Sequence, residues 1–202
     1  MSKRYIAGIE GGGTSWKVAL GEITADGTSV ELLADTVEKV YTTVPEETLS
    51  KINAWLHRVA DQVIAVGIAS FGPVDPKRSS PNFGHIGKTP KKHWSGANVV
   101  GRIMRGLEHL PVGFDTDVNA PALSEFIRSG MAAQDMTSCA YITVGTGIGV
   151  GQFSTFHVEK SVCCVSALRL MVRFFFIVLT ILPGLIVNGR PVHGLMHPEG
   201  GH

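Results

Sequence analysis

The sequence lacks the features of several large protein classes. Cysteine is scarce: there are three, Cys139, Cys163 and Cys164, and two of them are adjacent. This pattern provides neither a disulfide framework nor the paired spacing of a zinc site, and it indicates a reducing, cytoplasmic compartment. Charge of neither sign is in excess, because 18 Lys and Arg stand against 17 Asp and Glu. No basic stripe therefore predicts a nucleic-acid partner.

Signals for export or membrane insertion are missing or incomplete. The N-terminal segment MSKRYIAGIEGGG has an apolar run that is too short for a signal peptide and ends in glycines. The most apolar stretch, FFFIVLTILPGLIV at 174–187, has fourteen residues, whereas a membrane span needs about twenty. Arg169 and Arg173 lie just upstream of it, and Pro183 and Gly184 interrupt its last third. We therefore expect no stable membrane insertion.

The sequence does contain a succession of strand and helix patterns. Hydrophobic residues make up 44% and charged residues 17%, which is typical of a globular chain with a core. Apolar periodicity predicts strands at 5–9, 16–23, 31–42, 63–72, 111–120 and 138–151, and helices at 45–61, after a cap at Ser95, and at 121–130. Strands come first and then alternate with helices, which favours an α/β fold with a mixed sheet. The long 72–96 loop, rich in Pro, Gly and Lys, has the length of a functional loop.

Two glycine clusters follow apolar strands: EGGGT at 10–14 and GTGIGVG at 145–151. Glycine allows a backbone to turn sharply and to approach a phosphate, which exposed N–H groups then hold. Two tight hairpins without a ligand are the alternative. Neither cluster is a P-loop or a dinucleotide fingerprint, because Thr14 stands where the P-loop has lysine and no helix follows either cluster. Two such turns facing each other across a cleft would instead grip a nucleotide from both sides.

Six segments occur in the order found in the ROK family, and within it in the bacterial-type fructokinases, which the chain resembles over about 1–151 and 185–202. They are GIEGGGT, IASFGPVD, KTPKKHW, TDVNAPAL, YITVGTGIGVG and NGRPVHGLMHPEGGH. The resemblance implies the actin-like ATPase, ribonuclease H-like fold of two-domain sugar kinases. It places an N-terminal domain at 1–120, with the first phosphate loop and the sugar loop. An incomplete second domain follows at 121–202.

An aspartate at the end of a predicted strand is the candidate base. Asp117 lies just before a helix start, at the kind of edge where α/β sheets bind ligands. A helix cap is the structural alternative, and the resemblance supports the catalytic role because the family's catalytic aspartate maps to Asp117. Asp115, two residues earlier, is the second candidate.

The resemblance also implies the remaining roles. The phosphate loops map to Gly12, Gly13 and Thr14 and to Gly145, Thr146 and Gly147. A sugar contact maps to Glu199, a magnesium ligand to Glu10, and a zinc ligand to His202, whose partner ligands are expected further downstream. Asn119, by its polar side chain, is a candidate sugar contact and could equally cap the helix. The implied activity is ATP- and Mg²⁺-dependent phosphorylation of a hexose, most simply of fructose to fructose 6-phosphate, by an enzyme that could be a homodimer. A ROK-type sugar-binding regulator without kinase activity and an inactive kinase fragment are the alternatives.

One segment departs from the family pattern. About thirty-three residues, 152–184, separate the second glycine cluster from LIVNGRPVHG, although the two would otherwise join into one family-like hairpin. The segment carries Cys163, Cys164 and most of the apolar run, and its Phe- and Leu-rich composition matches the translation of a pyrimidine-rich intron end. We therefore expect a truncated kinase that is interrupted by a foreign segment, with poor solubility and weak ATP binding as the consequence.

Overall fold

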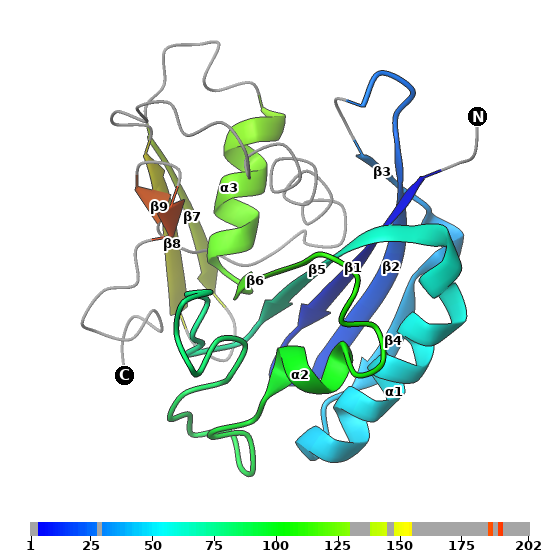
Figure 1. Cartoon of the computed structure of the whole chain (residues 1–202). Helices are drawn as coiled ribbons and strands as arrows, with labels where there is room; N and C mark the ends of the chain where they lie inside the picture. Colours follow the sequence, from blue (N-terminus) through cyan, green and yellow to red (C-terminus); the bar gives the residue numbers. More distant parts are fainter. Residues whose placement is uncertain are drawn as a thin grey trace.

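The computed structural model describes residues 4–27, 30–129, 138–144 and 148–154, and the short strands at 186–187 and 190–191. Its centre is a mixed sheet built from β1 (Tyr5–Gly11), β2 (Ser15–Ile23), β3 (Val30–Leu32), β4 (Glu38–Tyr41), β5 (Val63–Ser70) and β6 (Val112–Thr116). The strand order is β3-β2-β1-β5-β6, and β4 pairs with the first half of β2, from Ser15 to Val18 (Figure 1). Strand β1 is antiparallel to β2 and parallel to β5, and β5 is parallel to β6. The predicted mixed sheet is confirmed.

The prediction of one continuous strand at 31–42 is wrong. Strands β3 and β4 are separated by the 3₁₀ helix η1 (Ala34–Thr36). The Thr36 hydroxyl donates to the carbonyl oxygen of Leu33 at 2.6 Å and accepts from the backbone N–H of Leu20 at 2.9 Å. A side chain thus replaces a strand neighbour at this point of the edge, which periodicity cannot reveal.

The helix predicted at 45–61 is confirmed as α1 (Pro45–Val59), and it covers one face of the sheet. Pro45 takes the first helical position, where its missing N–H costs nothing, and the first turn carries two glutamates that favour the positive end of the helix dipole. The apolar side chains of α1 pack against the strands and are fully or almost fully buried: Leu49, Ile52, Trp55 and Leu56. Each contributes about 1.5–3 kcal/mol through burial.

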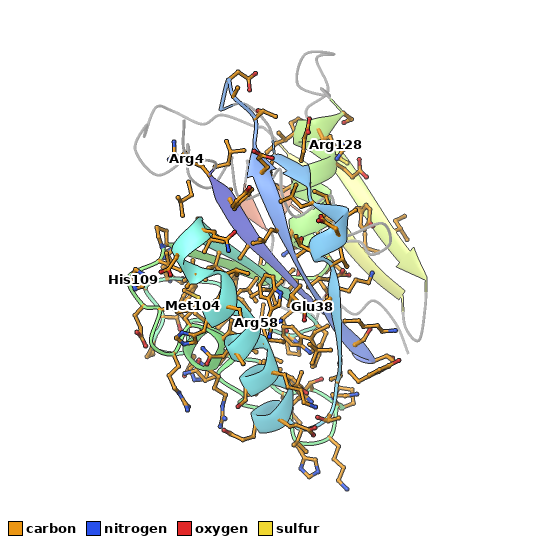
Figure 2. All side chains as sticks on the ribbon, turned by 90° about the vertical axis from the view of Figure 1, so that its right-hand side faces the viewer. Arg4, Glu38, Arg58, Met104, His109 and Arg128 are labelled. Atoms are coloured by element: carbon orange, nitrogen blue, oxygen red, sulfur yellow. The ribbon has the colours of Figure 1, made fainter. Side chains whose placement is uncertain are left out.

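An exposed ion pair links α1 to the edge strand. The Arg58 guanidinium donates to both Glu38 carboxylate oxygens, at 2.7 and 2.9 Å, and the two labelled side chains lie together in Figure 2. Both side chains remain more than half exposed, so the pair adds little to stability.

Helix α2 (Val99–Ile103) packs beside α1 at the end of the long loop. The predicted cap at Ser95 is wrong: the Asn98 side chain caps α2 by accepting from the Gly101 N–H at 2.7 Å. The Ser95 hydroxyl instead bonds to the backbone of Thr89 within the loop. Loop geometry therefore places the helix cap at Asn98, three residues beyond the predicted cap.

The second part of the chain begins with helix α3 (Asn119–Arg128), which packs on the hairpin of β7 (Ser138–Val144) and β8 (Ile148–Ser154) (Figure 1). The helix starts two residues before Pro121, its predicted start, so the predicted domain boundary at 120 falls within its first turn. Residues 152–154, the first three of the predicted foreign segment, belong to β8 and pair with β7. Strands β9 (Ile186–Val187) and β10 (Arg190–Pro191) pair with each other. No helix in the described ranges is long and apolar enough to span a membrane.

Candidate active site

Three parallel strands end at one edge of the sheet and bring distant segments together. The backbone N–H of Phe71, just after β5, donates to the Gly11 carbonyl oxygen at 2.7 Å. The N–H of Asp117, just after β6, donates to the Ser70 carbonyl oxygen at 2.8 Å. The glycine turn, the long loop and the aspartate segment therefore start side by side, at the carboxyl edge where α/β sheets bind their ligands.

The first glycine turn, residues 12–14, is held by a neighbouring strand end. It closes through a hydrogen bond from Gly12 N–H to the Ser15 carbonyl oxygen at 3.0 Å. The Thr42 hydroxyl donates to the Gly12 carbonyl oxygen at 2.8 Å, and the Thr42 N–H donates to the Thr14 carbonyl oxygen at 3.0 Å. In the described part of the chain, the N–H groups of Gly13 and Thr14 have no hydrogen-bond acceptor. They are available to an anion.

The glycines of this segment serve different purposes. A Cβ on Gly11 would lie 2.5 Å from the ring of the fully buried Trp16, so glycine is required there by packing. Neither Gly12 nor Gly13 has a positive φ. A Cβ on Gly13 would meet nothing within 4 Å. Gly13 therefore leaves the turn open to a close-approaching ligand rather than supplying a backbone angle that other residues avoid, whereas a Cβ on Gly12 would lie 3.1 Å from the Ser15 carbonyl oxygen.

Two carboxyl groups lie in one row across the sheet at this edge. In the strand register, Glu10 is opposite Ala69, and Ala69 is opposite Asp115. Register partners project from the same face of a sheet, so both carboxyl groups share the face against which Ala120 of α3 packs. Only the small Ala69 lies between them, and two strand spacings correspond to about 10 Å.

Glu10 lies near the end of β1, two residues before the glycine turn, and is 8% exposed. Burial raises the pKa of its carboxyl group to about 7, although the neighbouring Lys17 ammonium opposes the shift. The Lys17 Nζ lies 3.7 Å from Glu10 Oε2, which is beyond hydrogen-bond distance, and this buried oxygen has no hydrogen-bond partner. An unsatisfied buried carboxyl oxygen suits a hard cation such as Mg²⁺, which commonly takes one or two protein carboxylates.

Asp115 orients its neighbours from a partly buried position. Its Oδ1 accepts two hydrogen bonds, from the Thr116 N–H at 2.7 Å and from the Asn119 side-chain amide at 3.1 Å. Burial raises the pKa of the Asp115 carboxyl to about 7, and these two hydrogen bonds oppose the shift. Asn119 is therefore not the helix cap: its own N–H donates to the Thr116 hydroxyl at 2.9 Å, and its amide is fixed by Asp115.

Asp117 lies on the connection between β6 and α3, partly buried, so the predicted strand-end position is confirmed. Asp117, Asn119, Glu10 and the turn 12–14 thus lie at one edge of the structure. The other predicted site residues, Gly145, Thr146, Gly147, Glu199 and His202, lie outside the described residues. Within the described ranges no three His, Cys, Asp or Glu side chains gather as metal ligands, so the zinc site stays a prediction.

Sequence reasoning missed two residues that contact the glycine turn. Thr42 lies in a short connection after β4, and Lys91 in the long loop donates from its ammonium group to the Gly13 carbonyl oxygen. Lys91 belongs to the KTPKKHW segment, which resembles the family sequence but gives no local signal that its lysine contacts the glycine turn. Neither contact has a periodicity signal, because each joins residues far apart in the sequence.

Comparison with known proteins gives this arrangement a class and a family. The solved structure of a ROK family glucokinase from Streptomyces griseus, in complex with glucose and AMPPNP, has a TM-score of 0.57 and 28% identity, covering 78% of this chain and 46% of that one. The fold is that of the sugar kinases with an actin-like ATPase architecture. The ROK family profile matches residues 6–159, and the chain belongs to the ROK family.

Several relatives are named fructokinase, and others are glucokinases of Streptomyces. The chain is 36% identical to the fructokinase of Zymomonas mobilis over 204 residues, which are 99% of this chain and 54% of that protein. It is 38% identical to the fructokinase of Streptococcus mutans over 153 residues, which are 75% of this chain and 47% of that protein. The chain thus spans about half the length of these relatives.

Proposed function

We propose that the protein containing this chain is an ATP-dependent hexose kinase that converts fructose to fructose 6-phosphate. The observation that carries the proposal is the placement of Asp117 and an open glycine turn on one sheet edge, joined through the backbones of β1, β5 and β6. Phosphoryl transfer requires positioning, charge neutralisation and a base beside the acceptor hydroxyl. The names of the fructokinase relatives support fructose as the acceptor.

In this mechanism Asp117 is the general base. Its carboxylate takes the proton of the sugar hydroxyl while the hydroxyl oxygen forms a bond to the γ-phosphorus, and the bond to the β,γ-bridging oxygen breaks, leaving ADP. Asn119 orients the sugar from a side chain whose amide Asp115 already holds. Glu199 is proposed as the second sugar contact. Asp117 then returns its proton to solvent.

The glycine turns hold the nucleotide in this proposal. Gly13 and Thr14 bind phosphate oxygens through their backbone N–H groups and the threonine hydroxyl, while Gly12 closes the turn through its bond to Ser15. Residues 145–147 are proposed to bind phosphate oxygens from the second domain. Glu10 would hold Mg²⁺ through its unsatisfied oxygen. When bound, the ion would neutralise charge on the transferring phosphate. We further propose the domain division at 120, a zinc site that includes His202, a homodimer and a cytoplasmic location.

A hexose panel tests the proposal. The full-length protein is assayed with fructose, glucose and mannose, Mg²⁺ and ATP, and ADP release is measured. We expect fructose to be the preferred acceptor. Asp117→Asn should lower kcat by several orders of magnitude and leave AMPPNP binding nearly unchanged, whereas Asp35→Asn, an exposed carboxylate outside the site, serves as the control. Turnover within a few-fold of wild type in Asp117→Asn would exclude Asp117 as the base. Fructose binding without any turnover would support the sugar-binding regulator instead.

A further inference from the structure

The long loop after β5 carries a lysine onto the glycine turn. The Lys91 ammonium group donates to the Gly13 carbonyl oxygen, across 78 positions of sequence. The Lys91 backbone is fixed as well: its carbonyl oxygen accepts from the Trp94 N–H at 3.1 Å, and its N–H donates to the Thr89 hydroxyl at 3.4 Å. The ammonium group is therefore presented to the turn by an ordered segment.

Trp94 anchors this segment in the core. It is fully buried and stacks on Trp16, the first apolar residue of β2, with ring centroids 5.8 Å apart and an interplanar angle of 21°. Its indole N–H donates to the Thr43 carbonyl oxygen at 2.8 Å. Trp16 is the residue that packs over Gly11. The segment that carries Lys91 and the start of the glycine turn thus both pack against the stacked pair Trp16 and Trp94.

The positive charge of Lys91 is not neutralised in the described part of the chain. No carboxylate in these ranges forms an ion pair with it. Lys17, the lysine on the adjacent strand, differs because its ammonium lies 3.7 Å from Glu10. A lysine ammonium has three donors, and the Gly13 carbonyl oxygen occupies one. In the described part of the chain its other two donors have no acceptor, and the turn that it contacts also carries the unpaired N–H groups of Gly13 and Thr14.

We propose that Lys91 binds the terminal phosphates of ATP, together with the N–H groups of the first glycine turn. A lysine ammonium beside consecutive free backbone N–H groups is the donor set that binds polyphosphate. In the absence of nucleotide, the hydrogen bond to the Gly13 carbonyl oxygen keeps the Lys91 ammonium group at the turn. This inference rests on the proposed kinase function, because ATP is the polyphosphate that this reaction supplies.

A purely structural role for Lys91 makes a different prediction. If the lysine only fastens the loop to the turn, a neutral side chain that can still donate to Gly13 would suffice. Lys91→Gln keeps an N–H donor and removes the charge, so it separates the two roles. Lys91→Arg keeps both charge and donors. Lys92→Ala is the matched control, because Lys92 is the adjacent exposed lysine and has no contact with the turn in the described structure.

The test is calorimetric titration of the full-length protein and its variants with Mg²⁺-AMPPNP and, separately, with AMP, combined with fructose turnover. Charge-assisted hydrogen bonds are strong enough for Lys91→Gln to weaken AMPPNP binding about tenfold or more. In Lys91→Gln, AMP affinity and the KM for fructose should stay within about twofold of wild type. Lys92→Ala should bind both AMPPNP and AMP within about twofold of wild type. Lys91→Arg should regain most of the AMPPNP affinity that Lys91→Gln loses. Each variant is first checked for native-like unfolding in urea.

Other results would overturn the inference. AMPPNP affinity of Lys91→Gln equal to wild type would assign Lys91 a fastening role only, and equal weakening of AMPPNP and AMP would indicate a general disturbance of the site. The two proposals fail separately. A wild-type protein that binds AMPPNP but phosphorylates no hexose refutes the kinase function and leaves the Lys91 comparison valid. A wild-type protein that binds no AMPPNP refutes both.

Discussion

Replacing Asp115 with asparagine should remove a pH dependence of stability that burial imposes. The pKa of this carboxyl is raised from 3.8 to about 7, so the folded state holds the proton more tightly than the unfolded state. Its contribution to the free energy of unfolding is therefore complete below about pH 4 and is lost as the pH rises through about 7. Asparagine retains a carbonyl oxygen for the hydrogen bonds from Thr116 and Asn119, both of which Oδ1 accepts in the wild type.

The magnitude follows from the shift. Between pH 5 and about pH 7 the Asp115 carboxyl is protonated in the folded state and ionised in the unfolded state. Over these two pH units the free energy of unfolding of the wild type falls by about 1.4 kcal/mol per unit. The full effect is about 3 kcal/mol, and partial contact of Asp115 with solvent reduces the expected value to about 2 kcal/mol. Asp115→Asn lacks this loss, so it should be more stable than the wild type at pH 8 by about 2 kcal/mol more than at pH 5.

Urea unfolding at the two pH values measures the difference. Glu47→Gln is the control, because hydrogen bonds from Lys51 and Thr43 lower the pKa of the Glu47 carboxyl. Its stabilising contribution is lost only as the pH falls through that lowered pKa, below pH 5, so its stability should run parallel to wild type from pH 5 to pH 8. Equal pH dependence of Asp115→Asn and wild type would show that burial does not hold this carboxyl protonated.

Two further predictions concern the base of the glycine turn. Gly11→Ala should lower the free energy of unfolding by about 1–3 kcal/mol, because the new Cβ would lie 2.5 Å from the buried Trp16 ring; Gly13→Ala, whose Cβ meets nothing within 4 Å, should unfold like the wild type in urea. Trp94→Phe should cost about 1–3 kcal/mol by leaving a cavity and removing the indole hydrogen bond to Thr43; an unchanged urea midpoint would show that the indole does not anchor the long loop.

Elements with a strong local signal were predictable. The prediction of α1 is confirmed because its start is marked by Pro45 and its apolar positions recur at helical spacing. Strand β5 is confirmed because it is a continuous apolar run of strand length, buried on both faces. The start of α2 and the break between β3 and β4 were not predictable, since each depends on which polar side chain finds a backbone partner. Asn98 caps the helix where Ser95 was equally suitable by residue type.

The candidate site divides in the same way. The sequence by itself determined which chemical groups were available: an aspartate at a strand end, a glycine turn, and a series of segments that match the ROK family. The tertiary structure decided which groups act together. It placed Glu10 and Asp115 in one row through the strand register. It also directed the Asn119 side-chain amide to Asp115, so that this side chain does not cap the helix.

The contacts around the glycine turn were decided by the tertiary structure alone. Thr42 and Lys91 reach Gly12 and Gly13 from 30 and 78 positions away. Local propensity acts over a few residues, whereas the Thr42 contact continues the pairing of β4 with β2. The Lys91 contact exists because Trp94 buries its ring on Trp16 and thereby brings the long loop to the sheet edge. Residue types in the sequence state which interactions are possible, but only packing of the core brings a given donor within reach of a given acceptor.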